Sequence, residues 1–517
     1  MTRPDGVLVG LDVGTTNVKA AAYALDGSTV AIAVRPLPVE RPRPTWAEYD
    51  PRLLIETSFA TLREVARALS DAGTKVLGVA VASMAETAVP VDRQGEPLHA
   101  AIAWHDERTL EQARWWREHG HAPRVHTLTG LPVQPIFGIQ KIMWLRQHAP
   151  DAYARMDAWL NTADYVAYRL SGVQATDLSL ASRMMVLDLA DRRWSTELLS
   201  ACGVPSSVLP ELVASGTRLG AVTEAAAGPS GLPVGTPVVA GGHDHPCGAL
   251  AVGLTEVGDV LDSMGTSESV LTITSGASVS AAAAAAGYQQ GVHVAPGRTY
   301  CNGGLYTSGA AIEWARMVFT DVAQERVGAL VELAGQSNDS DVLFLPHLRM
   351  ANPPHVDDAS RGAFVGIDVG TSRADLARAV IRGLAFEAQA SLEGMERQLG
   401  FTARRMRLVG GGARNRLLVR DKAALFDGRT EVADVEEATS LGAAMLAGLG
   451  VGAFASADEA IDAMTPGANL VEVDAEEAAR VRARYRDVYL HLYDALAPLH
   501  RRLRAHAADE ERPRRAP

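Results

Sequence analysis

Residues 7–23 read VLVGLDVGTTNVKAAAY, two apolar runs separated by Gly14-Thr15-Thr16. The runs have the length of buried strands, and the glycine between them allows a tight turn, so the sequence predicts a hairpin of a core sheet. Residues 260–273, VLDSMGTSESVLTI, repeat this layout around Gly265-Thr266-Ser267. The repetition predicts a duplicated α/β architecture whose halves meet near residues 250–258.

Length and charge exclude several classes of protein. The chain has 517 residues, which exceeds the ~250–300 at which a single core stops growing, so two large domains are expected. It carries 49 Lys plus Arg against 61 Asp plus Glu, a net charge of 49 − 61 = −12. Because nucleic acids and anionic membranes attract basic faces, we expect neither as a partner.

The location of the protein is predicted from three further features. Its three cysteines are too few and too widely spaced for a disulfide framework, which suggests reduced thiols. The first residues, MTRPDGVLVGLDVG, lack the layout of a signal peptide, and no apolar run reaches the length of a membrane span. A cytoplasmic protein is therefore expected.

Periodicity places further elements along the chain. Buried strands are expected at residues 76–82 and 237–240, and helices at residues 51–68, 109–116, 140–147, 163–170 and 440–447. Residues 281–286, all alanine, predict a short helix or a mobile connection. A long helix from Asp474 should dock an apolar stripe, which includes Val488 and Leu499, on the body of the protein.

Three glycine segments favour phosphate and nucleotide binding. Glycines let the backbone approach a phosphate, and Thr or Ser hydroxyls add donors, which suits Gly14-Thr15-Thr16 and Gly265-Thr266-Ser267. The chain contains no Walker loop and no dinucleotide fingerprint. Gly410–Asn415, between a strand and a helix, could lie against a flat ring or be a plain connection. Gly366–Ser372 resembles the first loop, but a helix comes after it instead of a strand, so no phosphate role is assigned to it.

Two aspartates stand where catalysis of phosphoryl transfer would need them. Asp12 ends the first strand beside the predicted phosphates, a position that suits Mg²⁺. Asp244 follows a buried strand and two glycines, which points a carboxylate to the carboxyl edge of a sheet, where a general base is needed. Asp244 could instead cap the helix from Pro246. A metal site at His243 and His245 is not favoured, because two residues apart on a strand end they should face opposite ways.

Taken in order, these segments resemble the FGGY family of carbohydrate kinases, of the actin-like ATPase superfamily. The resemblance runs from Val7 to Gly450 and includes three further segments: WHDER at residues 104–108, KIMWLRQH at residues 141–148 and RGAFVGI at residues 361–367. It implies an α/β fold of two actin-like (ribonuclease H-like) domains with a deep cleft between them. We expect residues 1–254 and 255–505 to form these domains and residues 506–517 to form a disordered tail.

The resemblance also implies roles for individual residues. Asp244 would be the catalytic base, and Asp12 would hold Mg²⁺. ATP would lie on the glycine loops at Gly14, Thr15, Thr16, Gly265, Thr266, Ser267, Gly411, Gly412 and Asn415. The sugar would contact Glu86, Trp104, Asp106 and His245. Ala85 stands where glycerol kinases carry an arginine, which argues against a plain glycerol kinase.

The predicted activity is ATP-dependent phosphorylation of a small sugar or polyol. Whether the substrate is a polyol, such as glycerol or erythritol, or a pentulose or deoxyhexulose stays open. The rival class is a non-catalytic, actin-like sugar sensor, but a sensor that had lost catalysis should also have lost Asp244. The oligomeric state is left open, with a homodimer as one option.

Overall fold

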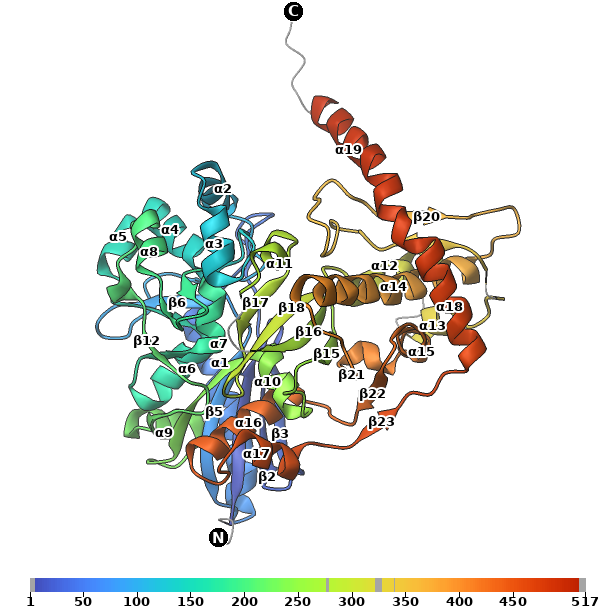
Figure 1. Ribbon diagram of the computed structural model, residues 1–517. Coiled ribbons are helices and arrows are strands. Elements are labelled where there is room, and N and C mark those ends of the chain that lie inside the picture. Colours follow the sequence, from blue (N-terminus) through green and yellow to red (C-terminus); the bar gives the residue numbers. More distant parts are fainter. Residues whose placement is uncertain (1–4, 276–278, 321–327, 339, 511–517) are drawn as a thin grey trace, which may run out of the picture.

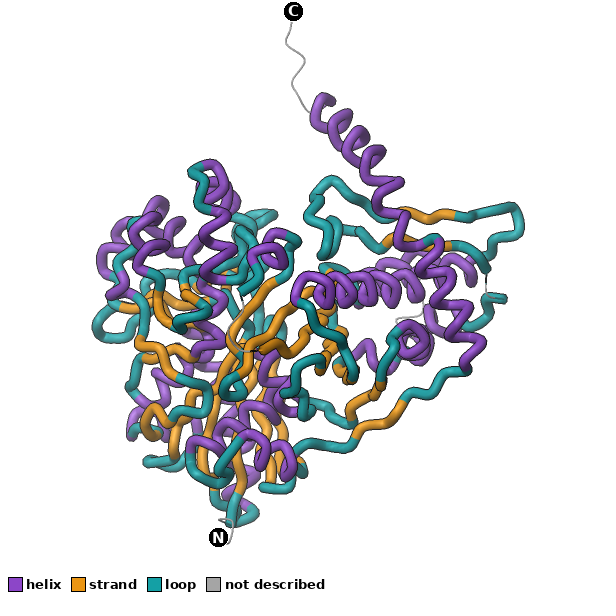
Figure 2. Tube along the Cα trace, viewed as in Figure 1, coloured by secondary structure: helices purple, strands orange, loops and turns teal. Residues whose placement is uncertain are grey.

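The computed structural model describes residues 5–275, 279–320, 328–338 and 340–510, with side chains to residue 506. Two large mixed sheets organise the chain, one in each half, with helices around them (Figures 1 and 2). This is the predicted α/β architecture with two domains. Among the described residues, no helix combines the length and apolar character that crossing a membrane requires.

The first sheet has six strands, three of which run parallel in its centre. Their buried, nearly continuous apolar sequences suit a sheet covered on both faces. The strands, in spatial order, are β13 (Arg218–Ala221), β14 (Pro237–His243), β5 (Val76–Ser83), β1 (Val7–Val13), β2 (Asn17–Ala24) and β3 (Thr29–Pro36). β1 and β2 form the predicted hairpin, with Asp12 opposite Lys19.

The second sheet has seven strands in a related arrangement. In spatial order they are β17 (Gln289–Val292), β18 (Arg298–Leu305), β16 (Glu268–Ser275), β15 (Asp259–Met264), β21 (Arg405–Val409), β22 (Arg429–Ala433) and β23 (Ala468–Leu470). The order β18-β16-β15-β21-β22-β23 has the same strand directions as β3-β2-β1-β5-β14-β13. Among the described strands β17 is the one addition, so the predicted duplication is confirmed.

Two helices, α10 (Asp244–Ala251) and α16 (Ala438–Gly450), connect the halves. α16 packs on β1, β5 and β14 although it comes after most of the second sheet in sequence. Glycines allow this close approach, since a Cβ on Gly442 would lie 1.9 Å from the Cys247 carbonyl oxygen of α10. α10 contacts the first sheet's core through Leu250 and the second sheet's core through Ala249. The residue that begins α10 is therefore fixed relative to both sheets.

Other elements complete the two halves. In the first half they are α1 (Pro51–Asp71), α2 (Leu110–Glu118), α3 (Ala122–Thr129), α4 (Gly138–His148), α5 (Pro150–Arg155), α6 (Thr162–Ser171), α7 (Leu178–Ala181), α8 (Thr196–Cys202), α9 (Glu224–Ser230) and the small strands β4 (Glu48–Tyr49), β6 (Ala88–Val91), β7 (Ala101–Ile102), β8 (Ala158–Asn161), β9 (Ala175–Asp177), β10 (Leu187–Asp188), β11 (Arg193–Trp194) and β12 (Glu211–Val213). In the second half they are α11 (Ala281–Ala285), α12 (Gly309–Phe319), α13 (Gly328–Ala334), α14 (Arg373–Leu399), α15 (Arg416–Leu425), α17 (Ala457–Met464), β19 (Leu343–Leu345) and β20 (Ala363–Val365). The helices and strands predicted from periodicity are present, and the alanine run is a short helix.

The predicted C-terminal helix is broken in two. α18 (Ala475–Asp487) begins after Asp474 and buries Val481 and Tyr485, but the chain leaves helical geometry at Val488, and α19 (Leu492–Glu510) then projects from the body (Figures 1 and 2). Val488 and Leu499 are 44% and 57% exposed. The expectation that the whole stripe docks is wrong, because one straight helix would be needed to keep it on one face.

Residues 366–372 have the structure predicted for them, which differs from that of the first glycine loop. The strand before them, β20, pairs with β19 and joins neither large sheet. Ser372 caps α14 together with Asp375. The segment leads into a helix, and it resembles the two glycine hairpins in sequence only.

Candidate active site

Three parallel strands of the first sheet end at one edge. Val13 of β1 and His243 of β14 both lie opposite Ser83, the last residue of β5. The segments that come after these strands therefore gather at one place: the first glycine loop, the turn that contains Glu86, and Asp244. The carboxyl edge of such a sheet is the usual position for a ligand site.

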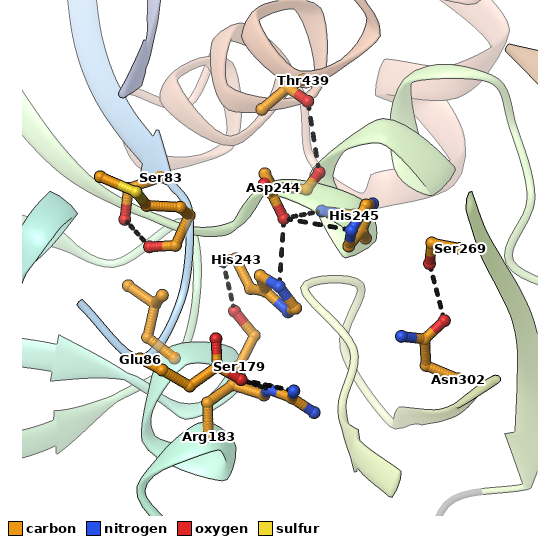
Figure 3. A network of polar contacts seen from close by, with 12 residues as sticks. Ser83, Glu86, Ser179, Arg183, His243, Asp244, His245, Ser269, Asn302 and Thr439 are labelled. Atoms are coloured by element: carbon orange, nitrogen blue, oxygen red, sulfur yellow. Dashed lines mark hydrogen bonds and ion pairs between the residues drawn. The ribbon is translucent and has the colours of Figure 1, made fainter. Parts of the chain in front are cut away.

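Asp244 lies where β14 ends and α10 begins, held by its two neighbours (Figure 3). Its Oδ1 accepts a hydrogen bond from the backbone N–H of His245 at 2.7 Å and lies 3.1 Å from His243 Nε2. Burial opposes ionisation, but the imidazoles of His245 and His243 outweigh it, and the pKa of Asp244 lies below its usual range. The carboxylate is thus ionised at neutral pH, and the contacts on Oδ1 leave Oδ2 for a ligand. In the described part of the chain, the Asp244 side chain caps no N–H further along the helix.

The two histidines do not diverge, contrary to the expectation from the sequence. Their ring centroids are 5.5 Å apart, and their ligand atoms and an oxygen of Asp244 lie within 4.8 Å of one another. The extended chain ends at His243, so the alternation of a strand does not extend to His245. Such a cluster could hold a transition metal. His243, however, already contacts the Tyr300 hydroxyl at 3.3 Å and Asp244, and these contacts fix the position of the Asp244 carboxylate instead.

A further set of contacts, which no sequence motif predicted, holds the end of β14. The strand bulges between Ala240 and Gly242, and the Ser179 hydroxyl accepts the His243 N–H at 2.8 Å. The carboxylate of Asp177 accepts from the Ser179 N–H at 2.9 Å. A Cβ on Gly242 would lie 2.7 Å from Ser179 Oγ, so glycine is required there.

Glu86 is held in a left-handed backbone conformation, with φ of 61°. The buried Lys141 ammonium donates to the Glu86 carbonyl at 2.5 Å and to the Ile102 carbonyl at 3.1 Å. Burial lowers the pKa of Lys141 to about 7, and the Glu86 charge opposes this shift. A non-glycine residue with positive φ costs free energy that its surroundings must offset, and such residues concentrate at functional sites.

Arg183 is the main polar residue that the sequence did not reveal. It follows α7, lies 97 positions from Glu86, and donates from Nε to Glu86 Oε1 at 2.6 Å (Figure 3). Its Nη2 also contacts Glu86 and donates to Gln289 Oε1 of the second sheet at 2.6 Å. A lone arginine outside any motif gives no signal in the sequence.

Trp104 and Asp106 have different surroundings, although both belong to the WHDER segment. Trp104 is half-buried and donates from Nε1 to the Thr15 hydroxyl at 3.0 Å. It therefore connects the first glycine loop with the part of the site that contains Glu86. Asp106 is buried: its Oδ2 pairs with Arg108 Nη2 at 2.8 Å and accepts the Ala47 N–H at 2.6 Å, and its Oδ1 accepts from Arg108 Nε at 2.9 Å. Its two oxygens are thereby engaged, which favours a structural role over the predicted sugar contact.

Asp12 is buried at the end of β1 with an unsatisfied oxygen. Its Oδ1 has no hydrogen-bond partner in the described part of the chain. Burial and the nearby Asp244 charge raise the pKa of Asp12 to about 8, and Lys19 opposes the shift only partly because it is paired with Glu437 at 2.7 Å. A hard cation would satisfy this carboxylate and hold it ionised, so the residues present fit Mg²⁺.

The two glycine hairpins close in a similar way, but the first loop is one residue longer than the second. The Gly14 N–H donates to the Asn17 carbonyl at 3.0 Å, and the Gly265 N–H donates to the Ser267 carbonyl at 2.9 Å. Thr16 and the three residues 265–267 are exposed. The Thr266 carbonyl also accepts two N–H groups at the start of α12, which anchors the second loop.

The third glycine segment lies next to the second hairpin. β15 and β21 are parallel, and a Cβ on Gly410 or Gly412 would lie 2.7 or 2.6 Å from Met264. Gly411 faces open space. Asn415 caps α15 through Oδ1, and its buried Nδ2 has no partner among the residues that the structure describes. The segment, a 3₁₀ turn over Gly411–Arg414, thus offers backbone without side chains at its glycines and one free amide donor.

Comparisons with known proteins agree on one family. The N-terminal domain of the FGGY family of carbohydrate kinases matches residues 7–251, and the C-terminal domain matches residues 261–451. A glycerol kinase of Geobacter sp. (strain M21) is 31% identical, covering 86% of this chain and 90% of the relative. A xylulose kinase of Staphylococcus xylosus is 27% identical over the same shares. The xylulose kinase structure from Rhodospirillum rubrum has a TM-score of 0.87 at 26% identity, covering 96% of this chain and 100% of that chain.

Proposed function

Because the chain belongs to the FGGY family of carbohydrate kinases and so transfers phosphate from ATP to a sugar or polyol, we propose that Asp244 is the base of this transfer. The observation that carries the assignment is the placement of its carboxylate. Oδ1 is fixed by His245 and His243, Asp244 begins a helix packed on both sheets, and Glu86 lies at the same sheet edge.

In this mechanism, Oδ2 of Asp244 accepts the proton of the acceptor hydroxyl as its oxygen attacks the γ-phosphorus in line. Catalysis of this kind is mostly positioning and electrostatic stabilisation, so a carboxylate with a low pKa suffices as the base. Glu86 accepts hydrogen bonds from other hydroxyls of the acceptor, and Trp104 borders both the acceptor and the first glycine loop. His245 lies beside the base, where it can contact the same substrate.

The nucleotide would lie on the three glycine segments. The glycine loops at residues 14–16 and 265–267 would bind phosphates, and residues 410–415 would support the adenosine through Gly411, Gly412 and the free amide of Asn415. Mg²⁺ would be held by Asp12, directly or through water, and supplies neutralisation of charge on the phosphate oxygens. We also propose that the domains divide near residues 254 and 255, which the family matches on either side of this point support.

The test is a screen for acceptor-dependent release of ADP. Polyols of three to five carbons, pentuloses and deoxyhexuloses are compared with a no-acceptor control, and the phosphorylated product is identified by mass. We expect one class to raise the rate far above the control. ADP release that no acceptor stimulates would remove the proposed reaction.

The acceptor has two candidate classes, a polyol and a ketose. A buried carboxylate that accepts from hydroxyls, Glu86, favours a polyol or open-chain sugar. Ala85, with no charge to offer, disfavours a glycerol-type contact at that position. The screen separates the two classes directly.

A further inference from the structure

Arg183 has one nitrogen with no partner in the described interior of the protein. The side chain is buried, with the residue 4% exposed, and Nε and Nη2 are occupied by Glu86 and Gln289. Nη1 has no hydrogen-bond partner in the described part of the chain. A buried, charged donor without an acceptor is costly, so such a group in a native structure calls for a ligand or water.

The guanidinium is held rigidly in this position. It lies 5.2 Å from the ring centroid of Phe137, on the N-terminal side of α4, in a cation–π contact. Gln289 from the second sheet contacts Gln134 of the first half at 3.3 Å, so Arg183 is also connected to a polar chain between the halves. The direction of Nη1 is therefore fixed before any ligand binds.

The Arg183–Glu86 pair lies beside the proposed base. Both charges act on His245, the neighbour of Asp244: Arg183 lowers the pKa of this histidine and Glu86 raises it, while burial has the largest effect and lowers it. Figure 3 shows the pair next to His243, which lies between the pair and Asp244 in this view. An acceptor that reaches both Asp244 and the pair would extend past His243.

We propose that Arg183 is a specificity-determining residue of the acceptor site, where Nη1 donates to one oxygen of the sugar and Glu86 accepts from the neighbouring hydroxyl. This inference rests on the proposed function. The pair presents one donor and one acceptor, which matches two adjacent oxygens such as a vicinal diol or an α-hydroxy ketone. Ala85, buried and uncharged, offers no alternative donor side chain.

The charge of the pair narrows the substrate class further. The Arg183 cation is paired with Glu86 at contact distance, and Asp244 adds a second carboxylate. A sugar acid would bring a third carboxylate into this buried site, where like charges repel strongly. The acceptor is therefore a neutral sugar or polyol and not an aldonate.

The test uses xylulose, glycerol and gluconate as probes of a ketose, a polyol and an aldonate. For the neutral probe that the unaltered protein phosphorylates best, Arg183→Met should raise the KM roughly ten- to hundredfold, the usual effect of losing a charge-assisted hydrogen bond. The KM for ATP should stay within twofold. Arg146→Met is the matched control, since Arg146 also lies in the first half and donates to the carbonyls of Cys202 and Gly203, outside the site.

A second variant gives a readout that a structural role would not produce. Glu86→Gln leaves the Arg183 cation unneutralised, so the ratio of kcat/KM for gluconate to that for the neutral probe should rise at least ~10-fold. Arg183→Met should not raise this ratio. The double variant, Glu86→Gln with Arg183→Met, removes both charges together. It replaces a single variant in the test if that single variant does not fold. It should show the raised KM without the gain for gluconate.

Three results would overturn the inference. An unchanged KM in Arg183→Met, or in the double variant, with wild-type activity intact would remove Arg183 from the acceptor site and leave the proposed function standing. A wild-type preference for gluconate would contradict the charge argument. If no acceptor in the wider screen stimulates ADP release, the proposed function fails and the inference fails with it.

Discussion

The two large sheets share one pattern of strand directions but differ in the residues at the ends of their parallel strands. Both sheets carry a glycine hairpin after their first parallel strand, at residues 14–16 and 265–267. The other strand ends differ: β5 and β14 lead to the charged residues Glu86 and Asp244, whereas β21 leads to the glycines at 410–412. A duplicated scaffold thus carries two kinds of edge, of which the first suits acid–base chemistry on an acceptor and the second suits close approach of a nucleotide.

The buried acids beside the two hairpins make the contrast sharper. In the second sheet Asp262 and Glu268 share Lys422, whose ammonium lies 2.5 Å and 2.7 Å from their oxygens. In the first sheet Lys19 is paired with Glu437 and not with Asp12. Asp12 and Asp262 each keep one oxygen without a hydrogen-bond partner among the described residues. The second site thus receives a contacting cation from the protein itself, whereas Asp12 has none in contact, which is consistent with a bound cation at the first site.

Because Lys422 is the cation that contacts both acids of the second site, removing this lysine should have the largest effect on stability. Lys422→Met leaves Asp262 and Glu268 buried without a cation, and breaking a buried pair costs about 3–5 kcal/mol. Lys19→Met is the matched change in the first sheet, where the pair is partly exposed, and should cost about 1 kcal/mol or less. Urea denaturation of both variants measures the difference. Equal losses would contradict the contrast between the sites.

Asp244→Asn tests the chemistry assigned to the first edge. The amide keeps the shape of the carboxylate but cannot accept a proton, so kcat should fall at least ~10²-fold with near-native melting temperature and acceptor KM. The measurement is steady-state ADP release with the acceptor found in the screen. Turnover within a few-fold of wild type would exclude Asp244 as the base, whereas loss of folding would indicate a structural role.

Gly411→Val tests the nucleotide role of the second edge. A Cβ at this position meets no protein atom within 4 Å, so folding should be unaffected. The new side chain would occupy the surface proposed for adenosine and raise the KM for ATP about tenfold, equivalent to ~1.4 kcal/mol, with little change in the acceptor KM. Gly467→Val, at another open glycine, serves as the control. An unchanged KM for ATP would place the adenosine elsewhere.

Asp12→Asn should have a small effect, and unlike the stability loss predicted for Lys422→Met it should be a gain in stability. The pKa of Asp12 is about 8 in the folded protein against an ordinary 3.8, so between these values the folded state holds a proton that the unfolded chain has released. Stability is therefore lost as pH rises from about 4 to 8. Without divalent cations, the variant should melt a few degrees above wild type at pH 8, with a smaller difference at pH 5.

Wild type and Asp12→Asn also test directly whether Asp12 binds a cation. Mg²⁺ with ADP should raise the melting temperature of wild type more than that of Asp12→Asn, because only the carboxylate can bind the ion. Differential scanning fluorimetry with and without EDTA measures both effects. Equal stabilisation of the two proteins by Mg²⁺ and ADP would remove Asp12 from the cation site.

Much of the fold was predictable because its signals are local. The hairpins at residues 7–23 and 260–273, the strand before Asp244 and the helix after residue 372 each depend on apolar runs, glycines and caps within a few residues. The placement of Asp244 at a strand end was predictable for the same reason. The break at Val488 was not, because the apolar stripe continues through it and only packing against the body decides where the helix stops.

Local sequence was enough to establish the family, the duplicated hairpins and the position of the candidate base. Which charges meet was decided only in the folded chain. Arg183 reaches Glu86 across 97 positions, His243 and His245 converge because a strand ends between them, and Asp106 turns inward to Arg108. The physical reason is that hydrophobic and turn preferences act over a few residues, whereas a buried charge depends on partners that long-range packing brings into contact.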